Sequence, residues 1–291
     1  MVLVAMRGGS WPDRFLRGLA ATDAAELGLR LANRMLGVAG AIGIGIEVFD
    51  LQSPGLVLVI PIVLIGFVWA FLSITLPGKR RGFRGKTAIS ITSGDVLDAV
   101  SAAHVAFTVN ERFDCALGDR VDSDSIHGQV ITRLFNSDQL RFARAVDASL
   151  STQPHRPNAE TPPGERPAYP IGTVATIDHG AFRLFAVALA HTDVDTHMAS
   201  ASLGDLLAAM SSLWAVVRER SNGKPVVVPL FGSGLSRVPV PSQTLLELIL
   251  ASIEAASTSS AISTAGIEIR IADRALGHIN LRAVALTNSP R

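Results

Sequence analysis

A glycine-rich stretch late in the chain contains residues that could bind an anion. The run VVVPL at 226–230 predicts a buried strand, a helix is expected over 241–256, and between them lie Phe231, Gly232, Ser233, Gly234 and Leu235. Glycine lets backbone N–H groups approach a phosphate, and a following helix start adds a partial positive charge. We interpret the stretch first as a phosphate-binding loop, second as a plain turn, and third as the site of a nucleophilic Ser233. The third interpretation is the weakest, because Phe231 and Leu235 stand where a GxSxG nucleophile elbow has its glycines.

Two earlier stretches place polar side chains directly after predicted strands. TAISITS at 87–93 is followed by Gly94, Asp95 and Val96, and HVAFTV at 104–109 is followed by the segment NERFD. Asp95 could accept a hydrogen bond from the exocyclic amine of a base, and Asn110 and Asp114 could bind ribose hydroxyls. The alternative is that Gly94 and Asp95 form a turn in which Asp95 caps a helix.

The elements that must position these residues alternate between strands and helices. Further strands are expected at 173–178, 183–191, 267–272 and 279–286, and further helices at 123–135, 137–150 and 202–220, with a proline-rich loop at 151–170 and a turn at 178–180. This alternation predicts an α/β domain over 87–291, in three layers with a mixed central sheet covered on both faces.

A long apolar stretch precedes this domain. Residues 55–76 carry no charge, and a helix of that length spans roughly 30 Å, the thickness of a bilayer core. A weaker apolar stretch at 35–51 lies only three residues upstream, so we expect a two-helix transmembrane hairpin over 33–77. Both flanks of the hairpin are basic and its connection has no Lys or Arg. This pattern predicts a multi-pass protein of the inner membrane with both termini in the cytoplasm.

The segments beside the hairpin complete the predicted organisation. Residues 1–32 are interpreted as a short cytoplasmic amphipathic segment, and residues 78–86 as a basic linker that stops the membrane span. Gly37, Ala41 and Gly45 have the small-xxx-small spacing that lets helices approach closely in lipid. This spacing favours a homo-oligomer, although a glycine-rich helix of no special purpose is the alternative.

Composition argues against several other classes of protein. The formal net charge is +1, and the basic cluster adjoins the predicted span, where lipid headgroups explain it, so no nucleic-acid partner is expected. The single cysteine, Cys115, cannot form an internal disulfide or a multi-thiolate zinc site, and we interpret it as a packing residue. The histidines lack the spacing of a metal site, so neither a metal nor a cofactor is expected. Arg80 stands where a P-loop ending at Gly85 needs its first glycine, which excludes that nucleotide-binding motif.

Taken together, the polar stretches resemble a macro domain, the α/β fold that binds ADP-ribose. The resemblance rests on Gly94–Asp95–Val96 after an early strand, NERFD after the next strand, and FGSGL late in the chain. It implies ligand contacts at Asp95, Val96, Asn110, Phe113, Asp114 and Gly128, and at the five residues 231–235. The paired asparagines and triple glycine usual in the catalytic loop are replaced by NERFD and SIHGQ, which puts hydrolysis in doubt and leaves binding.

The full layout resembles the Thoeris ThsA effectors of the membrane–macro type, over about residues 33–291. That resemblance implies antiphage defence. In that family, a partner TIR-domain enzyme consumes NAD upon infection and makes an ADP-ribose-derived signal. The resemblance implies that the macro domain senses this signal and that the membrane part then compromises the inner membrane, giving abortive infection. The chain itself would then be no enzyme. The alternative is a membrane-tethered ADP-ribosyl hydrolase or NAD-processing enzyme, and a third class is a passive membrane-anchored binding module.

Overall fold

The carboxyl-terminal part of the chain folds as a unit. The computed structural model describes Leu64, Val68 and residues 79–290, apart from residues 119, 156–165, 194–197 and 282. The compact unit runs from Lys79 to Arg291. The predicted hairpin at 33–77, except Leu64 and Val68, and the predicted segment 1–32 lie outside the described residues. Within the part of the chain that is described, no helix combines the length and the apolar character needed to cross a bilayer.

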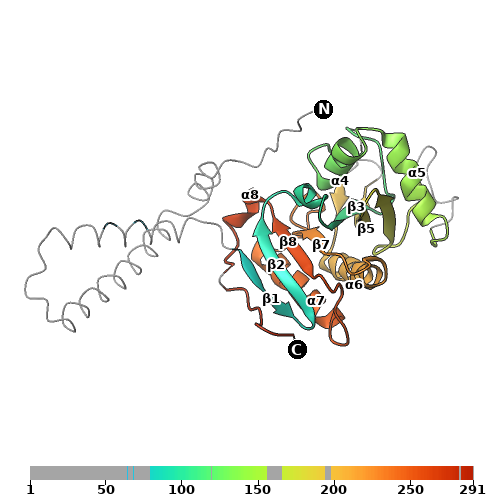
Figure 1. Ribbon diagram of the computed structural model, residues 1–291. Coiled ribbons are helices and arrows are strands. Elements are labelled where there is room, and N and C mark those ends of the chain that lie inside the picture. The colour runs from blue at the N-terminus through green and yellow to red at the C-terminus, as the bar shows by residue number, and fades with distance from the viewer. Residues whose placement is uncertain are drawn as a thin grey trace, which may run out of the picture. The chain divides into compact units, whose positions relative to one another are not determined.

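A single mixed sheet forms the centre of this unit (Figure 1). Five neighbouring strands are parallel, and an antiparallel strand lies at each edge, so the sheet is mixed, as the sequence predicts. A short strand adds to the end of β5 in antiparallel fashion. In spatial order the strands are β1 (Arg80–Arg84), β2 (Thr87–Ser93), β8 (Ile267–Ile271), β7 (Val226–Pro229), β3 (His104–Asn110), β5 (Phe182–Thr192) and β4 (Val174–His179), and the short strand is β6 (Ala199–Ser200).

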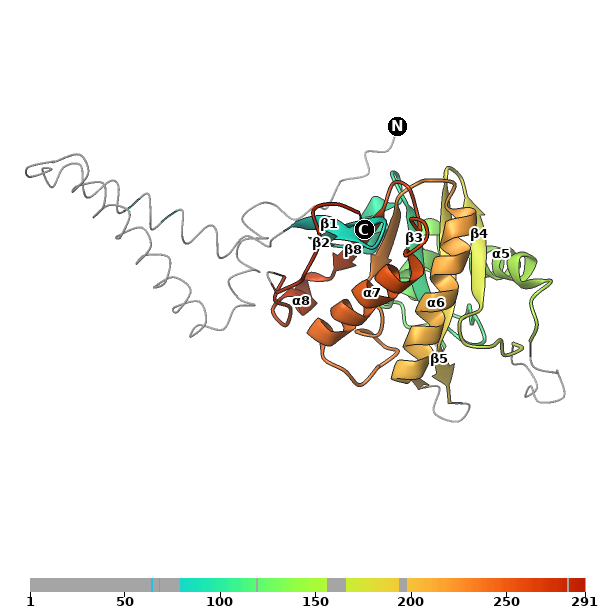
Figure 2. The same ribbon diagram turned by 90° about the horizontal axis from the view of Figure 1, so that it is seen from below.

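Helices cover both faces of the sheet and form the outer two layers. The long helices α6 (Leu203–Arg220) and α7 (Ser242–Ala256) pack against each other on one face, as Figure 2 shows. On the other face lie the 3-10 helix η1 (Val96–Ala99), α4 (Ile126–Gln129), the π-helix η2 (Val130–Leu134) and α5 (Gln139–Leu150), while α8 (Asp273–Leu276) follows the last strand.

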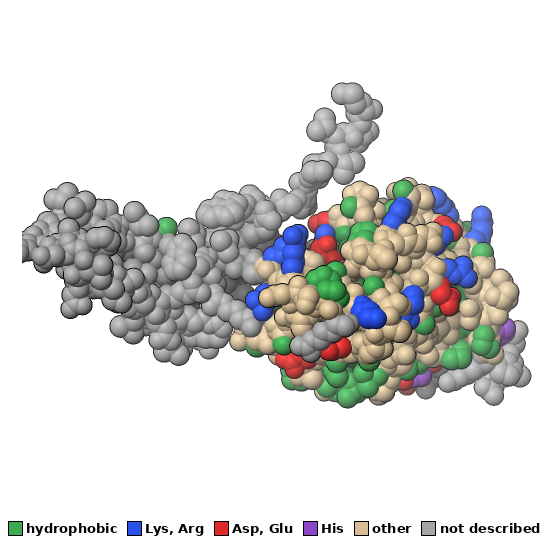
Figure 3. Space-filling view, turned by 60° about the horizontal axis from the view of Figure 1, so that its bottom comes forward, with side chains coloured by type: hydrophobic (Ala, Val, Ile, Leu, Met, Phe, Trp, Pro, Cys, Tyr) green, Lys and Arg blue, Asp and Glu red, His purple; other side chains and the backbone are tan. Residues whose placement is uncertain are grey.

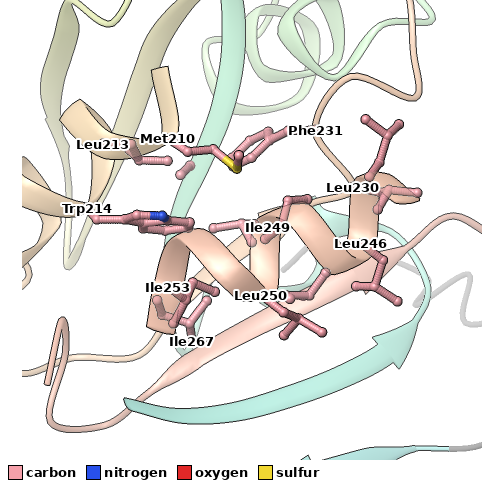
Figure 4. Close-up of a cluster of buried hydrophobic side chains, with 14 of the residues drawn as sticks. Met210, Leu213, Trp214, Leu230, Phe231, Leu246, Ile249, Leu250, Ile253 and Ile267 are labelled. Carbon is pink, nitrogen blue, oxygen red and sulfur yellow. The ribbon is translucent and has the colours of Figure 1, made fainter. Parts of the chain in front are cut away.

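Two hydrophobic clusters, one on each face of the sheet, stabilise the layers. On β3, Val105 and Phe107 belong to the cluster with α5, whereas Ala106 between them belongs to the cluster with α6 and α7. This division follows from the alternation of side chains along a strand. Figure 4 shows the second cluster, in which Trp214 of α6 packs among apolar side chains of α7 and its indole N–H donates to Ser252 over 2.9 Å. Burial of these apolar surfaces provides the main driving force for folding.

Local capping signals determine where α6 and α5 begin. Ser202 and Asp205 form a reciprocal capping box at the start of α6, which satisfies two backbone donors that the helix leaves free. Asp138 caps α5 by accepting from the N–H of Arg141 at 2.9 Å. The predicted helices at 202–220 and 137–150 are therefore confirmed to within about two residues. The predicted hairpin is confirmed as well, but its turn lies at Gly180 and Ala181 rather than at 178–180, because β4 continues to His179, which pairs with Phe182.

Three predicted elements differ from the structure. The segment expected as a basic linker contains β1, which pairs along its whole length with β2; charged side chains are common on edge strands because they discourage further pairing. Among its described residues, the segment 279–286 forms no strand, because a turn from Asn280 to Ala283 interrupts it, and a bridge to β1 follows just beyond it, at Thr287. The helix expected at 123–135 begins at Ile126, because Ser125 supplies the cap, and it continues as a π-helix.

Candidate functional site

A cleft of about 970 Å³ opens at the carboxyl ends of the parallel strands. Residues that directly follow β2, β7 and β8, together with the last residues of β3 and β5, form its walls. The predicted residues on its lining are Asp95, Val96, Asn110 and the stretch from Phe231 to Leu235. In open α/β sheets, ligands bind in the crevice outside the carboxyl ends of the strands. The structure therefore brings three segments that are distant in the sequence to one candidate binding site.

The glycine-rich stretch forms one wall of the cleft, and its two glycines differ in their surroundings. Gly232 has a φ of +82°, and an added Cβ would lie 3.0 Å from Val238 and 3.1 Å from Leu245. Gly232 is therefore required by the turn itself. Gly234 lies outside the left-handed region, and an added Cβ would meet nothing within 4 Å. The fold does not explain the glycine at 234, whereas the close approach of a ligand to the backbone would.

The other residues of this stretch hold the turn in place. The Ser233 hydroxyl donates to the carbonyl of Leu230 at 2.7 Å, so it is engaged within its own turn rather than paired with a base, which disfavours its interpretation as a nucleophile. Phe231 is buried, and Figure 4 shows its ring beside Met210 of α6, so the side chain anchors the loop in the core. Leu235 is 45% exposed at the rim.

Asp95 fills one of the two roles considered for it, that of a helix cap. Its Oδ1 accepts from the N–H of Leu97 at 2.9 Å and thereby caps η1, as the alternative interpretation predicts. Its Oδ2 pairs with Arg133, and its carbonyl accepts from Arg270 at 2.7 Å. The side chain is still 39% exposed at the cleft. A carboxylate has about four lone-pair sites, so the Asp95 side chain can accept a further hydrogen bond. Its contact with a base remains a prediction.

Asn110 lies at the cleft, but its amide is bound inside the protein. The amide nitrogen donates to Asp114 at 2.7 Å and to Thr192 at 2.8 Å, and the amide oxygen accepts from the N–H of Asp114 at 3.1 Å. Both donors are thereby used. The side chain ties the end of β3 to the end of β5, and binding a ribose hydroxyl through its N–H groups would require one of these bonds to break.

Three residues expected to contact the ligand do not line the cleft. Phe113 is buried and packs edge-to-face on Tyr169 with ring centroids 5.5 Å apart. Asp114 is buried and lies 3.9 Å from Arg120. An added Cβ at Gly128 would lie 2.2 Å from the carbonyl oxygen of Asp122, so this glycine allows α4 to pack closely on the preceding loop. These three residues are close to the site in the sequence, but none of them is among the residues that line the cleft.

Several charged residues of the cleft were not predicted from the sequence. Arg270 of β8 donates to Glu268 at 2.7 Å as well as to the Asp95 carbonyl, and Glu268 accepts from Thr92 at 2.8 Å. Burial acts to raise the pKa of Glu268, but the hydrogen bonds from Arg270 and Thr92 lower it overall. This network joins β2, β8 and the turn after β2. Further charged or titratable side chains on the lining are Arg120, Asp122, Asp124, Asp273, Arg274 and His278.

A histidine bridge supports the far end of the cleft. His191 of β5 lies 2.7 Å from Glu111 through Nδ1 and 3.5 Å from Asp205 through Nε2. Burial acts to raise the pKa of Asp205, but hydrogen bonds from Ser202 and the nearby His191 lower it overall. The bridge joins the ends of β3 and β5 to the start of α6. Within the described part of the chain, no three such side chains converge as metal ligands.

The buried thiol of Cys115 fits the predicted packing role. Its Sγ donates to the carbonyl of Phe113 at 3.2 Å, and burial raises its pKa to about 11. The thiol is therefore protonated at neutral pH and is a poor nucleophile.

Comparison with protein families identifies this architecture. Residues 89–271 match the family described as Thoeris protein ThsA, Macro domain. The chain belongs to this ThsA macro-domain family. The match begins in β2 and ends with β8, so this ThsA macro domain includes all three segments that form the cleft. It confirms the predicted macro-like α/β domain with a mixed central sheet, and it associates the protein with antiphage defence and the sensing of a nucleotide signal.

Solved structures similar to this ThsA macro domain are distant in sequence. A mutant of the Oceanobacillus iheyensis macrodomain is 10% identical, with a TM-score of 0.42, over 69% of this chain and 94% of that one. Alphavirus P23pro-zbd is 11% identical, with a TM-score of 0.37, over 69% of this chain and 23% of that one. No curated protein sequence matches the chain.

One face of the described unit mixes charges of both signs. On the face seen in Figure 3, lysine and arginine side chains alternate with aspartate and glutamate rather than gathering into a single field. Nucleic-acid-binding domains usually show a basic patch or stripe instead.

Proposed function

We propose that the protein is a membrane-anchored antiphage defence effector. Its macro domain senses an ADP-ribose-derived nucleotide made by a partner TIR-domain enzyme, and the bound state leads to membrane disruption and abortive infection. Membership of a Thoeris family supports the defence role and the nucleotide signal. The membrane part of the proposal rests on the uncharged stretch 55–76, the shorter apolar stretch 35–51 and their basic flanks.

Gly234 is the observation that carries the binding part of the proposal. It lies on the cleft wall, its backbone is not in the left-handed region, and open space surrounds the position of its missing Cβ. A diphosphate placed against this wall would approach the backbone closely, and N–H groups in such turns bind anions well. In this arrangement Asp95 lies where an adenine amine would bind, at the end of β2.

The proposal includes that the macro domain binds the nucleotide without hydrolysing it. The Ser233 hydroxyl is bound to its own turn, and the Asn110 amide is bound to Asp114 and Thr192. The Ser233 hydroxyl is therefore not paired with a general base in the way that an activated nucleophile would be. Incubation with ADP-ribose conjugates should therefore leave them intact, and release of free product would favour the alternative, a membrane-tethered hydrolase.

Coupling to the membrane requires that the ligand favour one arrangement of the protein over another. We propose that the arrangement is a homo-oligomer in which Gly37, Ala41 and Gly45 let the membrane helices approach each other closely. Both termini lie in the cytoplasm in this scheme, so the macro domain has access to the soluble signal.

Substitution of Gly234 by aspartate tests the binding proposal. A new carboxylate about 6 Å from one phosphate charge costs about 2–3 kcal/mol at an effective dielectric constant of about 20, which is roughly a 30- to 150-fold loss of affinity. Gly234→Asn is the matched control, because it adds a side chain of nearly the same size without the charge. Gly232 is less suitable, because any substitution there strains the turn.

Isothermal titration calorimetry of the purified protein with ADP-ribose is the measurement. We expect Gly234→Asp to bind far more weakly than Gly234→Asn, and the difference to shrink as salt is added, because salt screens exposed charges. Equal affinities for the two variants would mean that no phosphate lies at this wall.

A further inference from the structure

A second pocket lies at the other end of the sheet. Its volume is about 680 Å³, and none of its lining residues lines the cleft. It is bordered by the turn between β4 and β5, by Phe135 after η2, and by Arg141 of α5. Phe182, the first residue of β5, lies on its wall, whereas the cleft begins where β5 ends. The volume falls within the range of about 300–1,000 Å³ that is usual for small-molecule sites.

A row of rings tilted to one another by 53° and 51° forms the wall of this pocket. The ring centroids of Phe135 and His179 lie 5.0 Å apart, and those of His179 and Phe182 lie 5.1 Å apart. Phe135 is buried and also packs edge-to-face on Phe142 at 5.1 Å, so the row of rings is anchored in the core. His179 and Phe182 are half-buried and present ring surface to the pocket. A row of rings held in this way is a preformed surface for another planar ring.

The backbone before α5 adopts uncommon conformations to place Phe135. The π-helix η2 ends at Leu134, immediately before Phe135, and is followed by Asn136 and Ser137 with φ values of 54° and 62°. The N–H of Ser137 donates to the carbonyl of Ile131 at 3.0 Å, which holds this turn. Single-turn π-helices and left-handed residues other than glycine are uncommon, and both occur frequently at functional sites.

One guanidinium group at the pocket has no acidic partner. Arg141 is exposed, and its guanidinium carbon lies 5.6 Å from the centroid of the Phe135 ring. Among the described residues, no carboxylate pairs with it, because Asp178, the acid on the pocket lining, binds Arg183 at 2.6 Å. Burial and then the charge of Arg141 lower the pKa of His179, so His179 is neutral at neutral pH. The pocket therefore presents aromatic surface beside a single available positive charge.

We propose that this second pocket binds a planar aromatic molecule that carries a carboxylate or a similar anion. The ring of the ligand would lie against His179 and Phe182, and its anionic group would pair with Arg141. A guanidinium that stacks on a ring and binds an anion is a common way to recognise such molecules. The site is independent of the cleft, and the proposal does not depend on the function of the cleft.

Ligand-observed fluorine NMR with the purified full-length protein tests the proposal. The probes are 4-fluorobenzoate and its neutral analogue 4-fluorobenzamide. We expect the wild type to bind the benzoate about 1.4-fold to fivefold more tightly than the amide, the range set by an exposed ion pair. Arg141→Gln should remove this preference. Arg144→Gln is the matched control, because Arg144 is also an exposed arginine of α5 and does not line the pocket, and it should retain the preference.

A second variant tests the ring surface. Phe182→Leu should weaken the binding of both probes by a similar factor, and thermal unfolding followed by circular dichroism would check that each variant is folded. Binding of the benzoate that is equal in the wild type and Arg141→Gln would place the anion elsewhere and overturn the proposal. Lack of binding by the wild type at millimolar probe concentrations would overturn it as well.

Discussion

Replacing His127 with phenylalanine should make the fold less sensitive to acid. His127 lies on α4 and is 7% exposed, with its ring centroid 5.9 Å from that of Phe107 and 5.5 Å from that of Phe142. Its Nε2 is buried without a hydrogen-bond partner. Burial lowers the pKa of this histidine from 6.5 to about 3. The ring must therefore lose its proton when the protein folds in mild acid.

The size of the effect follows from this pKa difference. Between pH 6.5 and about pH 3 the unfolded chain binds a proton at His127 that the folded protein does not, so the free energy of unfolding falls as the pH falls. From pH 7.5 to pH 5.0 the loss is about 2 kcal/mol. The result at pH 5.0 would be almost the same for a folded pKa of about 4, so it does not depend on the exact value.

Urea unfolding followed by circular dichroism, at pH 7.5 and pH 5.0, is the assay. The wild type should lose about 2 kcal/mol more than His127→Phe between the two pH values. Burial also lowers the pKa of His104 and of His179, but these groups are present in both proteins and cancel in the comparison. The loss of an unpaired nitrogen and the slightly larger ring change stability equally at both pH values. If the wild type and the variant lose the same free energy, His127 does not have the depressed pKa, and the reasoning fails.

Two further predictions concern the packing residues near the cleft. Burial raises the pKa of Cys115 to about 11, so its thiol should react slowly with iodoacetamide at pH 8 in the folded protein and rapidly in urea. Intact mass would follow the reaction, and rapid alkylation without urea would contradict the burial of the thiol. Gly232→Ala should lower the free energy of unfolding by about 1–3 kcal/mol, because of the positive φ and the contacts with Val238 and Leu245. Gly234→Ala should change the free energy of unfolding by less than about 0.5 kcal/mol. Equal losses in the two variants would contradict the distinction between the two glycines.

Much of the fold could be predicted because its signals are local. A capping box whose two members lie three residues apart marks the start of the helix over 202–220, and a turn between two apolar runs indicates the β4–β5 hairpin. The periodicity of apolar residues indicated which segments are strands and which are helices, because a strand repeats every two residues and a helix every 3.6. The alternation of the two indicated a mixed sheet between helices.

Strand pairing explains the elements that were missed. Arg80–Arg84 has the composition of a basic linker, but it forms a tight hairpin with β2, because Gly85 takes a φ of 55° and Arg84 lies opposite Thr87. The segment 279–286 has the alternation of a strand, yet a turn from Asn280 to Ala283 interrupts it, and the bridge to β1 is made just beyond it, by Thr287 with Phe83. The partner of Thr287 lies 204 residues away in the sequence, so no local pattern predicts this pairing.

The sequence by itself determined that a glycine-rich turn follows one buried strand and that polar residues follow two others. Only the tertiary structure decided which of these residues reach a common cleft. It bound the Asn110 amide to Thr192, 82 residues away, and brought Arg270 to the carbonyl of Asp95, 175 residues away. The surroundings of the two glycines also differ, because the turn requires a glycine at 232 but does not require one at 234. The reason is physical: the parallel strands end at one edge of the sheet whatever their order in the chain, so the contacts of each side chain depend on the neighbouring strands.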